Sequence, residues 1–360
     1  MKIRFLREAG GHGDVVRCLG TVASVRAALP DAKLWFYTVG VYDQWARMSP
    51  DVDRVVRVEW HERAPNEKPR KGEARTRDET PDPRKHPYLA RHGRFDATVD
   101  MYDPAFAHER QTSGMVYADR IDCWTGHAAV VLGVDLQPHL ARLAVGAHDY
   151  GWIDGWLHAV ASSPSRRPLV VLQPLSVDPR RSLTPVQTMR SVELLSAVGV
   201  SIVVAHVRTS SANTRIGTPR HRLEDATLRW LVRSRVPIFA APTMSTLAAL
   251  VSRADCLLTG DSALLHVAAA LGKLCVSLFG ITRGDIICKH YPLAVPICAG
   301  QRERAGCRCA EDGRACYGFP RRVGDDWRRP CGGAGCVAQT RVPSERLVEE
   351  VLGCLNHSRR

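Results

Sequence analysis

Three side chains that can bind anions or move protons lie close together in the segment Leu257–Gly280. Asp261 and Ser262 offer a carboxylate and a hydroxyl, and His266 follows about one helical turn later. The segment predicts a helix that starts at the carboxyl end of a strand. Unpaired N–H groups and the helix dipole converge at such a point, which favours binding of phosphate groups. The alternative is that Asp261 only caps the helix and His266 is a hydrogen-bonded core residue.

The elements that would position these side chains follow from the same segment. The apolar run 256–258 predicts a strand, which Gly260 interrupts. The carboxylate or hydroxyl that comes next would provide an N-cap oxygen for a helix over 263–271, and Gly272 would end it in a left-handed conformation. Residues 274–279 are apolar enough for a buried parallel strand. We therefore expect a strand–helix–strand crossover.

Two further loops carry residues suited to ligand binding. The stretch Gly10–Asp14, GGHGD, follows a predicted strand, and its glycines let the backbone approach a ligand closely. It lacks the full G-x-G-x-x-G spacing with a later ribose-binding acid, which argues against a nicotinamide site. The second loop, Gln173–Thr184, contains Ser176 and the pair Arg180-Arg181, whose guanidinium groups can bind phosphate bidentately. A solvent-exposed arginine pair without a ligand is the alternative.

Length and composition indicate two folded domains. The chain has 360 residues, of which 45% are hydrophobic. Its charged opening does not resemble a signal peptide, and no window approaches the roughly 18 apolar residues that span a bilayer. We expect a cytoplasmic protein, with peripheral association at the inner face of the membrane left open. The net charge of +13 indicates an anionic partner, such as a nucleotide diphosphate, a phosphorylated glycolipid, a membrane surface or nucleic acid.

Strand and helix patterns alternate along both halves of the chain. This predicts two Rossmann-like α/β domains, over 1–150 and 168–355, which face a central ligand cleft and are joined by a linker over 151–167. The predicted strands are 2–6, 34–39, 53–58, 96–99, 169–173, 201–205, 237–240, 256–258 and 274–279, and the other predicted helices are 15–28, 111–132, 152–160 and 344–355.

The segment 61–94 differs from its surroundings in composition. It is rich in Pro, Glu, Lys and Arg and has almost no aliphatic residues, which is typical of a mobile surface loop. The alternative is an arm that binds the acceptor or another polyanion.

The twelve cysteines fall into two groups. Six are scattered, mostly in apolar contexts, and we interpret them as core residues: Cys18, Cys123, Cys256, Cys275, Cys288 and Cys354. The other six lie in a polar, glycine-rich stretch over 298–336, namely Cys298, Cys307, Cys309, Cys316, Cys331 and Cys336. Reduced thiols at this density favour a structural tetrahedral metal site, most often zinc, with iron, free thiols or a disulfide as alternatives.

The pattern Asp-Ser-x-x-x-His-x-Ala-Ala-Ala-Leu-Gly-Lys, followed by Ser-Leu-Phe-Gly, resembles the donor-site signature of glycosyltransferase family 9, the ADP-heptose:lipopolysaccharide heptosyltransferases. The opening GGHGDVVRCLGTVASVRAALPDAKLWF and the ending GCVAQTRVPSERLVEEVL are similar to the same family. The resemblance covers the first sixty residues and most of 169–352. It implies a GT-B fold and the transfer of a sugar from a nucleotide-diphosphate donor with inversion.

The resemblance also implies roles for single residues. Asp14 matches the family's proposed general base, which would deprotonate the acceptor hydroxyl, and Gly11, His12 and Gly13 would line the acceptor side. Arg181 replaces a lysine that reaches the donor phosphates, with Leu183 where the family has an aromatic residue. The remaining donor-site residues would be Ser176, Thr243, Asp261, Ser262, Ala263 and His266.

Within this donor site, Ser262 and the N–H groups of Ala263 and Leu264 would meet the phosphates. A carboxylate beside a diphosphate would be repelled, so Asp261 is assigned to a sugar hydroxyl or to helix capping. Thr243 lies in a loop whose backbone would face the nucleobase, with a simple helix N-cap as the alternative. The family usually has Gly-Pro where this chain has Ala263-Leu264. No catalytic metal is expected, since the family uses helix dipoles and basic side chains instead.

We therefore expect a glycosyltransferase that moves a heptose-like sugar to a phosphorylated, lipopolysaccharide-type glycan. One alternative is transfer to a macromolecule, either a protein or a modified base in DNA, with the 61–94 arm and the cysteine stretch as recognition elements. A different class of alternative is a non-catalytic GT-B protein that binds a partner through the cysteine module. The oligomeric state is not predicted.

Overall fold

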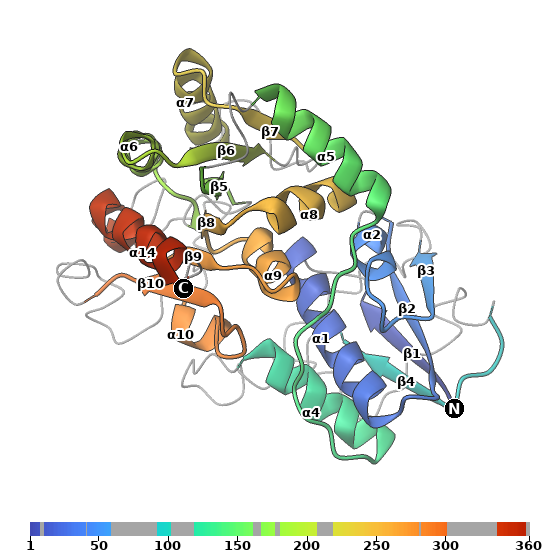
Figure 1. Cartoon of the computed structure of the whole chain (residues 1–360). Coiled ribbons are helices and arrows are strands. Elements are labelled where there is room, and N and C mark those ends of the chain that lie inside the picture. The colour runs from blue at the N-terminus through green and yellow to red at the C-terminus, as the bar shows by residue number, and fades with distance from the viewer. Residues whose placement is uncertain are drawn as a thin grey trace. The chain divides into compact units, whose positions relative to one another are not determined.

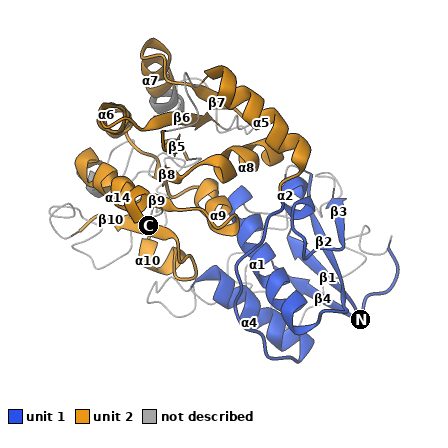
Figure 2. Cartoon of the chain, in the orientation of Figure 1, with its two compact units in different colours: residues 1–144 blue, residues 145–360 orange. Residues whose placement is uncertain are grey.

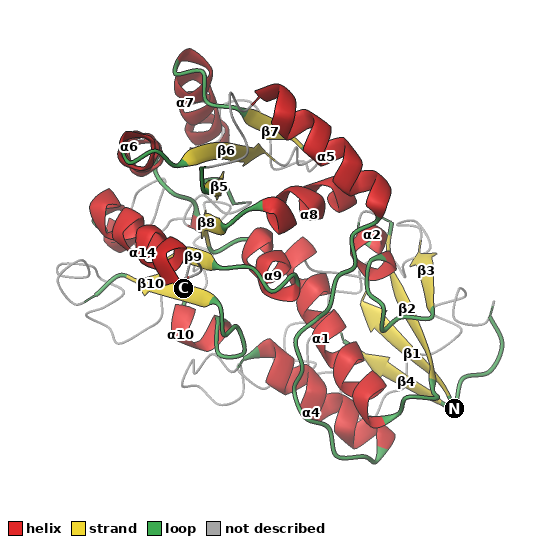
Figure 3. Cartoon of the chain, viewed as in Figure 1, coloured by secondary structure: helices red, strands yellow, loops and turns green. Residues whose placement is uncertain are grey.

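A computed structural model describes residues 1–7, 11–40, 42–58, 92–101, 119–160, 167–176, 181–206, 219–280, 282–300 and 337–357. The chain divides into two compact units, residues 1–144 and 145–360 (Figure 2). Each unit is built on a parallel sheet with helices around it (Figures 1 and 3). Most of the 61–94 segment and five of the six clustered cysteines lie outside the described residues.

The first unit has a four-stranded parallel sheet in the order β3-β2-β1-β4. Its core includes Ile3 and Phe5, which are both fully buried and share one face of the sheet because they alternate along β1. Helices α1 and α4 pack against each other, and α1 also contacts β1 and α2. The elements are β1 (Lys2–Arg7), α1 (His12–Ala28), β2 (Lys33–Val39), α2 (Asp43–Arg47), β3 (Arg54–Val58), β4 (Ala97–Asp100) and α4 (Arg120–Leu132).

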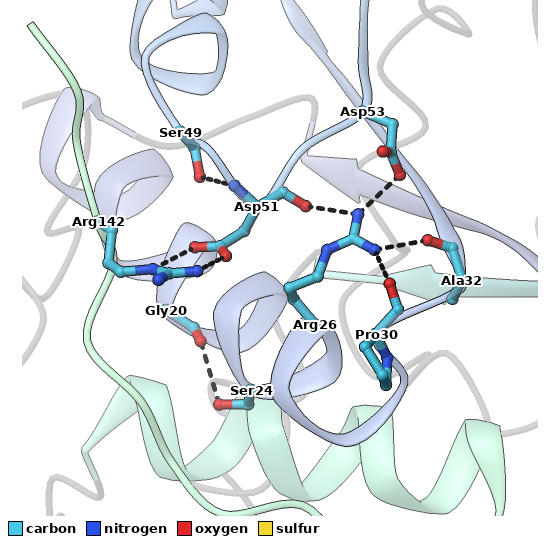
Figure 4. A network of polar contacts seen from close by, with 9 residues as sticks. All are labelled: Gly20, Ser24, Arg26, Pro30, Ala32, Ser49, Asp51, Asp53 and Arg142. Carbon is cyan, nitrogen blue, oxygen red and sulfur yellow. Dashed lines mark hydrogen bonds and ion pairs between the residues drawn. The ribbon is translucent and has the colours of Figure 1, made fainter.

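Two arginines connect segments of this unit through hydrogen bonds and ion pairs (Figure 4). Arg26, near the end of α1, donates to the carbonyl oxygens of Pro30 and Ala32 and pairs with Asp53 at 2.7 Å. Arg142 donates through Nε to Asp51 Oδ2 at 3.2 Å and through Nη2 to Oδ1. Because Asp51 is fully buried and Arg142 follows α4 by ten residues, this pair joins the end of the unit to the segment between α2 and β3.

The second unit has a six-stranded parallel sheet in the order β10-β9-β8-β5-β6-β7. A hydrophobic core joins alternate residues of its inner strands to α6 and α14 on one face, while α8, α9 and α10 contact the strands through other residues. The elements are α5 (Ala147–Val160), β5 (Leu169–Gln173), α6 (Pro185–Ala197), β6 (Ser201–His206), α7 (Pro219–Arg233), β7 (Ile238–Ala240), α8 (Met244–Arg253), β8 (Cys256–Gly260), α9 (Ala263–Ala270), β9 (Cys275–Phe279), α10 (Gly284–Ile287), β10 (Ala294–Cys298), α13 (Val337–Thr340) and α14 (Ser344–His357).

The strand order of each unit reverses at one point. In the first unit this point lies between β1 and β4, and in the second between β5 and β8. In open α/β sheets, ligands bind beyond the carboxyl ends of the strands at such a switch point. A ligand site is therefore expected in the loops that follow β1 and β4, and in those that follow β5 and β8.

The structure differs from the sequence prediction at several elements. Strand β8 continues through Gly260, which was expected to interrupt it, and β10 and the helices α2, α6, α7, α10 and α13 were not predicted. Helix α1 begins at His12 instead of Val15, because Gly11 is its N-cap in an extended conformation. The helix predicted over 152–160 begins earlier, as α5 over Ala147–Val160.

Other expectations agree with the structure. Gly272 has the predicted left-handed conformation, with φ of 63°. Five of the six scattered cysteines are buried free thiols, and Cys123 is half-buried. Among the described residues, no helix is both long and apolar enough to cross a membrane.

Candidate functional site

Asp14 lies in the first turn of α1, directly beyond the carboxyl end of β1. Its Oδ2 accepts a hydrogen bond from the backbone N–H of Gly11 at 2.9 Å, and Arg7 Nη2 lies 3.6 Å from the same oxygen. Arg120 Nη1 pairs with the other oxygen, Oδ1. Asp14 is therefore the third residue of its helix, accepts the N–H of the N-cap residue Gly11, and is held in place by two guanidinium groups.

These partners determine the charge state of Asp14. Burial by itself would raise its pKa, but the Arg120 and Arg7 guanidiniums and the Gly11 N–H outweigh burial and hold the pKa of Asp14 well below its usual range. The side chain still exposes 23% of its surface. Asp14 is thus a carboxylate that is ionised at neutral pH and that solvent or a ligand can reach.

Arg7 and Arg120 are themselves fixed by neighbouring elements. Arg7 Nη1 donates to the carbonyl oxygen of Met101, after β4, at 2.6 Å, and its guanidinium lies over the Trp124 ring at 5.1 Å. Arg120 is the first residue of α4, whose N-cap is Asp119. Asp119 in turn forms a buried ion pair with Arg17 of α1 at 2.9 Å. Residues that follow β1 and β4 therefore meet at the switch point of the first unit.

The glycine-rich stretch contributes one further side chain at this point. Gly11 and Gly13 flank His12, the first residue of α1, and Gly11 is the N-cap. His12 Nδ1 accepts a hydrogen bond from the indole N–H of Trp45 in α2 at 2.9 Å. Burial lowers the pKa of His12, so that its imidazole is neutral at neutral pH.

In the second unit, a buried hydrogen-bond network joins the carboxyl ends of β5 and β8. Gln173 Oε1 accepts from Thr259 Oγ1 at 3.0 Å and from Ser262 Oγ, and the two hydroxyls also lie 2.8 Å apart. The hydroxyl of Ser262 therefore points back to the sheet and does not cap α9. The prediction that Asp261 or Ser262 supplies an N-cap oxygen is wrong, because both side chains have other partners.

Helix α9 therefore begins without a side-chain hydrogen bond to its first N–H groups. Ser262 is the N-cap residue by position, in an extended conformation, and Ala263 begins the helix. The first N–H groups of a helix have no partner within it and carry the positive end of its dipole. The start of α9 is therefore suited to an anion, at the switch point of the second unit.

Asp261 is buried beside this helix start, with only 3% of its surface exposed. Thr282 Oγ1 donates to Asp261 Oδ2 at 2.8 Å, and Arg181 Nη1 lies 3.6 Å from the same oxygen. Ser176 Oγ donates to the backbone oxygen of Asp261 at 3.2 Å. Arg181 thus lies with Asp261 and Ser176 as one cluster, and its charge offsets that of the carboxylate.

Gly260 allows this cluster to form. A Cβ atom at residue 260 would collide with the backbone oxygen of Arg181. The loop that carries Arg181 therefore lies directly against the end of β8, and only a residue without a side chain fits between them.

Two other predicted donor-site residues make contacts of a structural kind. His266 Nδ1 is 2.7 Å from the hydroxyl of Tyr291, and the two rings meet edge to face. Thr243 is the N-cap of α8 and accepts a hydrogen bond from the backbone N–H of Thr246 at 3.1 Å. These contacts match the alternatives left open in the sequence analysis, and a ligand-binding role for either residue stays a prediction.

The predicted metal module stays a prediction as well. Cys298 is a half-buried free thiol at the end of β10. The other five cysteines of the cluster, together with Arg180, lie outside the described residues.

Sequence reasoning missed four residues that the structure brings into these clusters, namely Arg7, Arg120, Gln173 and Thr282. Gln173 could have been found, since it ends a predicted strand just before the Arg181 loop. Arg7, Arg120 and Thr282 lie in no motif, and their proximity to Asp14 or Asp261 depends on the strand order.

Comparison with known proteins agrees with this picture. The model of glycosyltransferase family 9 (heptosyltransferase) matches residues 216–316. No curated protein sequence matches the chain. Among solved structures, the chain is similar to ADP-heptose LPS heptosyltransferase II of E. coli, with 15% identity, complete coverage of both chains and a TM-score of 0.66.

Two further structures extend the comparison. A family 9 glycosyl transferase from Veillonella parvula DSM 2008 is 12% identical over 99% of this chain and 97% of its own, with a TM-score of 0.66. The iron-containing dodecameric glycosyltransferase TibC from enterotoxigenic E. coli H10407 is 13% identical over 99% of this chain and 78% of its own, with a TM-score of 0.55.

These comparisons indicate the fold and the class of enzyme. At such low identity the structural likeness shows the fold alone, and that fold is the predicted GT-B type. The family match confirms the resemblance to glycosyltransferase family 9 that the sequence predicts. The family match supports a glycosyltransferase enzyme.

Proposed function

We propose that this protein is an inverting glycosyltransferase that uses a nucleotide-diphosphate sugar, with a heptose-like sugar as the transferred group. The observation that carries the proposal is the start of α9, an N-terminus without a side-chain cap beside Arg181, at the switch point of the second unit. The family match over 216–316 includes this helix. The diphosphate would receive hydrogen bonds from the N–H groups of α9 and the charge of Arg181.

The reaction would proceed in one displacement. The acceptor hydroxyl oxygen forms a bond to the anomeric carbon, and the bond from that carbon to the phosphate oxygen breaks, so that the nucleoside diphosphate leaves with the bonding electrons. Asp14 would take the hydroxyl proton. A carboxylate paired with Arg120 and Arg7 is a weak base, so the transfer fits a late stage, when attack has made the hydroxyl strongly acidic.

For the acceptor we propose a phosphorylated, lipopolysaccharide-type glycan. The net charge of +13 supports an anionic acceptor, and the structural neighbour from E. coli is named as an LPS heptosyltransferase. The cysteine stretch over 298–336 is proposed to hold a structural metal, which metal analysis of the purified protein would test. The neighbour TibC is described as iron-containing, so iron and zinc should both be measured.

A transfer assay tests the catalytic proposal. The protein is incubated with ADP-heptose and deacylated lipopolysaccharide from a heptose-deficient strain, and the product linkage is determined by NMR. We expect transfer with inversion, and a loss of turnover of about 100-fold or more for Asp14→Asn, in line with the usual contribution of general-base catalysis.

The matched control is Asp149→Asn, which changes the third residue of α5 as Asp14→Asn changes the third residue of α1. This control should leave turnover unchanged. Full activity of Asp14→Asn would exclude Asp14 as the base, and retention of configuration would exclude the single displacement.

A further inference from the structure

A buried glutamine of α13 is hydrogen-bonded to the loop that carries Arg181. Gln339 is the third residue of α13, and only 1% of its surface is exposed. Its side-chain Nε2 donates to the backbone oxygen of Ser182 at 2.8 Å, over a sequence separation of 157 residues. Because a carbonyl oxygen can only accept, the amide atom that faces it must be the NH₂ group. The bond therefore links the C-terminal part of the second unit to the residue next to Arg181.

The amide of Gln339 is used for this one bond. Its other atom, Oε1, is buried and has no hydrogen-bond partner among the described residues. Burying a polar atom without a partner costs free energy, and an apolar side chain would fill the same space without that cost. The presence of an amide here is therefore explained by the bond that it makes to Ser182.

A second buried glutamine, Gln187 of α6, holds Gln339 in place. Gln187 Nε2 donates to the backbone oxygens of Gln339 and Val342, each at 2.9 Å. Its Oε1 accepts the backbone N–H of Thr184 at 3.0 Å. The two side chains thus form a buried chain of amide hydrogen bonds from the start of α6 to Ser182. Because the backbone of Gln339 is fixed by Gln187, the position of its Nε2 donor is fixed as well.

Ser182 connects this chain of hydrogen bonds to the proposed donor site. Its Oγ accepts the backbone N–H of Ser176 at 2.8 Å, and Ser176 Oγ donates to the backbone oxygen of Asp261 at 3.2 Å. Arg181 directly precedes Ser182, and its Nη1 lies 3.6 Å from Asp261 Oδ2. The loop is therefore held both by the cluster around Asp261 and by Gln339.

We infer that Gln339 is a positioning residue of the donor site, which acts through the backbone of Ser182 to keep the Arg181 guanidinium where it meets the donor diphosphate. This inference rests on the proposed function for the identity of the ligand. A charge-assisted hydrogen bond depends on distance and direction, so a displaced loop would weaken the contact with phosphate. The effect is confined to the phosphate-binding part of the site and does not extend to the nucleoside.

The variant Gln339→Met tests this role, because it removes the N–H donor and keeps an unbranched side chain of similar length. In calorimetric titrations its affinity for ADP should be lower by about fivefold or more, within the range of a lost hydrogen bond. Adenosine, which has no phosphate, should bind as it does to wild type. A general structural defect would weaken both ligands, so the difference between them reports on positioning.

The matched control is Val351→Ala in α14. Val351 is fully buried in the core of the same unit, and the loss of its side-chain atoms should lower the urea midpoint. The change removes no hydrogen bond of Gln339 or Ser182. This control should therefore bind both ADP and adenosine as wild type does, although it is less stable.

The position of the loop can also be measured without a ligand, by amide hydrogen exchange followed by NMR. The backbone N–H of Leu183 donates to the carbonyl oxygen of Pro174 at 2.8 Å, and that of Ser176 donates to Ser182 Oγ. Both amides should exchange faster in Gln339→Met than in Val351→Ala, because only the first variant releases the loop.

Wild-type affinity for ADP in Gln339→Met, or an equal loss for ADP and adenosine, would overturn the inference and leave the proposed function standing. If wild type bound no ADP, the proposed function would fail. Amide exchange would then decide separately whether Gln339 positions the loop, and equal exchange in the two variants would show that it does not.

Discussion

Arg120 and Asp14 form an ion pair between the first residue of α4 and the third residue of α1. The pair joins the loops that follow β4 and β1, the two strands at which the strand order of the first unit reverses. It therefore fixes the position of the proposed base and also its charge.

Arg120→Met should raise the pKa of Asp14, because the largest of the charges that lower it is removed. The acidic limb of kcat/KM would then move to higher pH.

The pH dependence of the free energy of unfolding should change as well. A depressed carboxyl pKa contributes stability that is complete above about pH 4, the ordinary value, and is lost as pH falls toward the folded-state pKa. The variant should lose part of that contribution.

Urea unfolding of wild type and Arg120→Met from about pH 6 to about pH 3 measures this difference, since the lower pH passes the ordinary carboxyl pKa. Arg47→Met, which removes an exposed arginine paired with Asp43, is the control and should show little change. Equal pH dependence of stability and activity in Arg120→Met and wild type would show that Arg120 does not hold the pKa of Asp14 down.

Gly260→Ala should weaken nucleotide binding, because the added Cβ would push away the backbone that carries Arg181. Calorimetric titration with ADP should show an affinity lower by about tenfold or more, as expected when a charged hydrogen bond is lost. The control is Gly353→Ala in α14, where a Cβ meets open space and alanine should stabilise the helix by up to about 1 kcal/mol. Wild-type affinity in Gly260→Ala would mean that the Arg181 loop is not part of the donor site.

Gln173→Glu tests the network at the ends of β5 and β8. The change keeps the shape and the Oε1 acceptor for Thr259 and Ser262. It replaces the Nε2 donor to the Leu175 carbonyl oxygen with a second oxygen, and it adds a buried negative charge next to the start of α9. A carboxylate there repels a diphosphate, so ADP should bind more weakly while adenosine, which lacks phosphate, should bind as to wild type. Equal losses for both ligands would indicate a structural defect instead.

Asp51→Asn should destabilise the first unit by about 1–3 kcal/mol, because the buried carboxylate loses its charge and one of the two oxygens that accept from Arg142. Arg190→Ala removes a pair with Glu345 in which both side chains are about half exposed, and should cost at most about 1 kcal/mol. Urea unfolding compares the two variants. Equal losses would show that the Arg142 contact is no stronger than an ordinary surface ion pair.

The sequence predicts most strands of both sheets, because buried parallel strands are continuous apolar runs bounded by glycine or polar residues. The run 169–173 coincides with β5, and 201–205 lies within β6. Strand β10 was missed since it contains Pro296 and ends at Cys298, which we had interpreted as part of a metal cluster. Local patterns identify such an edge strand poorly, because its place is set by pairing with β9.

The site was predictable as far as its residues lie in one local motif. Asp14, Asp261 and Ser262 each follow a strand within one loop, so the sequence and the family resemblance can single them out as candidates. The residues that pair with Asp14 and Asp261 could not be predicted in this way. Arg120 pairs with Asp14 over a separation of 106 residues, and Thr282 binds Asp261 over 21. Such contacts depend on strand order and on helix packing, which a single sequence does not specify.

The central claim is that the second unit binds a nucleotide-diphosphate sugar at the start of α9. Thermal unfolding of wild type, Arg181→Ala and Arg229→Ala with ADP and ADP-heptose tests it most directly, since a ligand of the native state raises the unfolding midpoint by mass action. Arg229 is an exposed arginine of α7 and serves as the control. We predict a rise in midpoint for wild type and Arg229→Ala that is lost in Arg181→Ala. No rise in wild type, or an equal rise in all three proteins, would contradict the account.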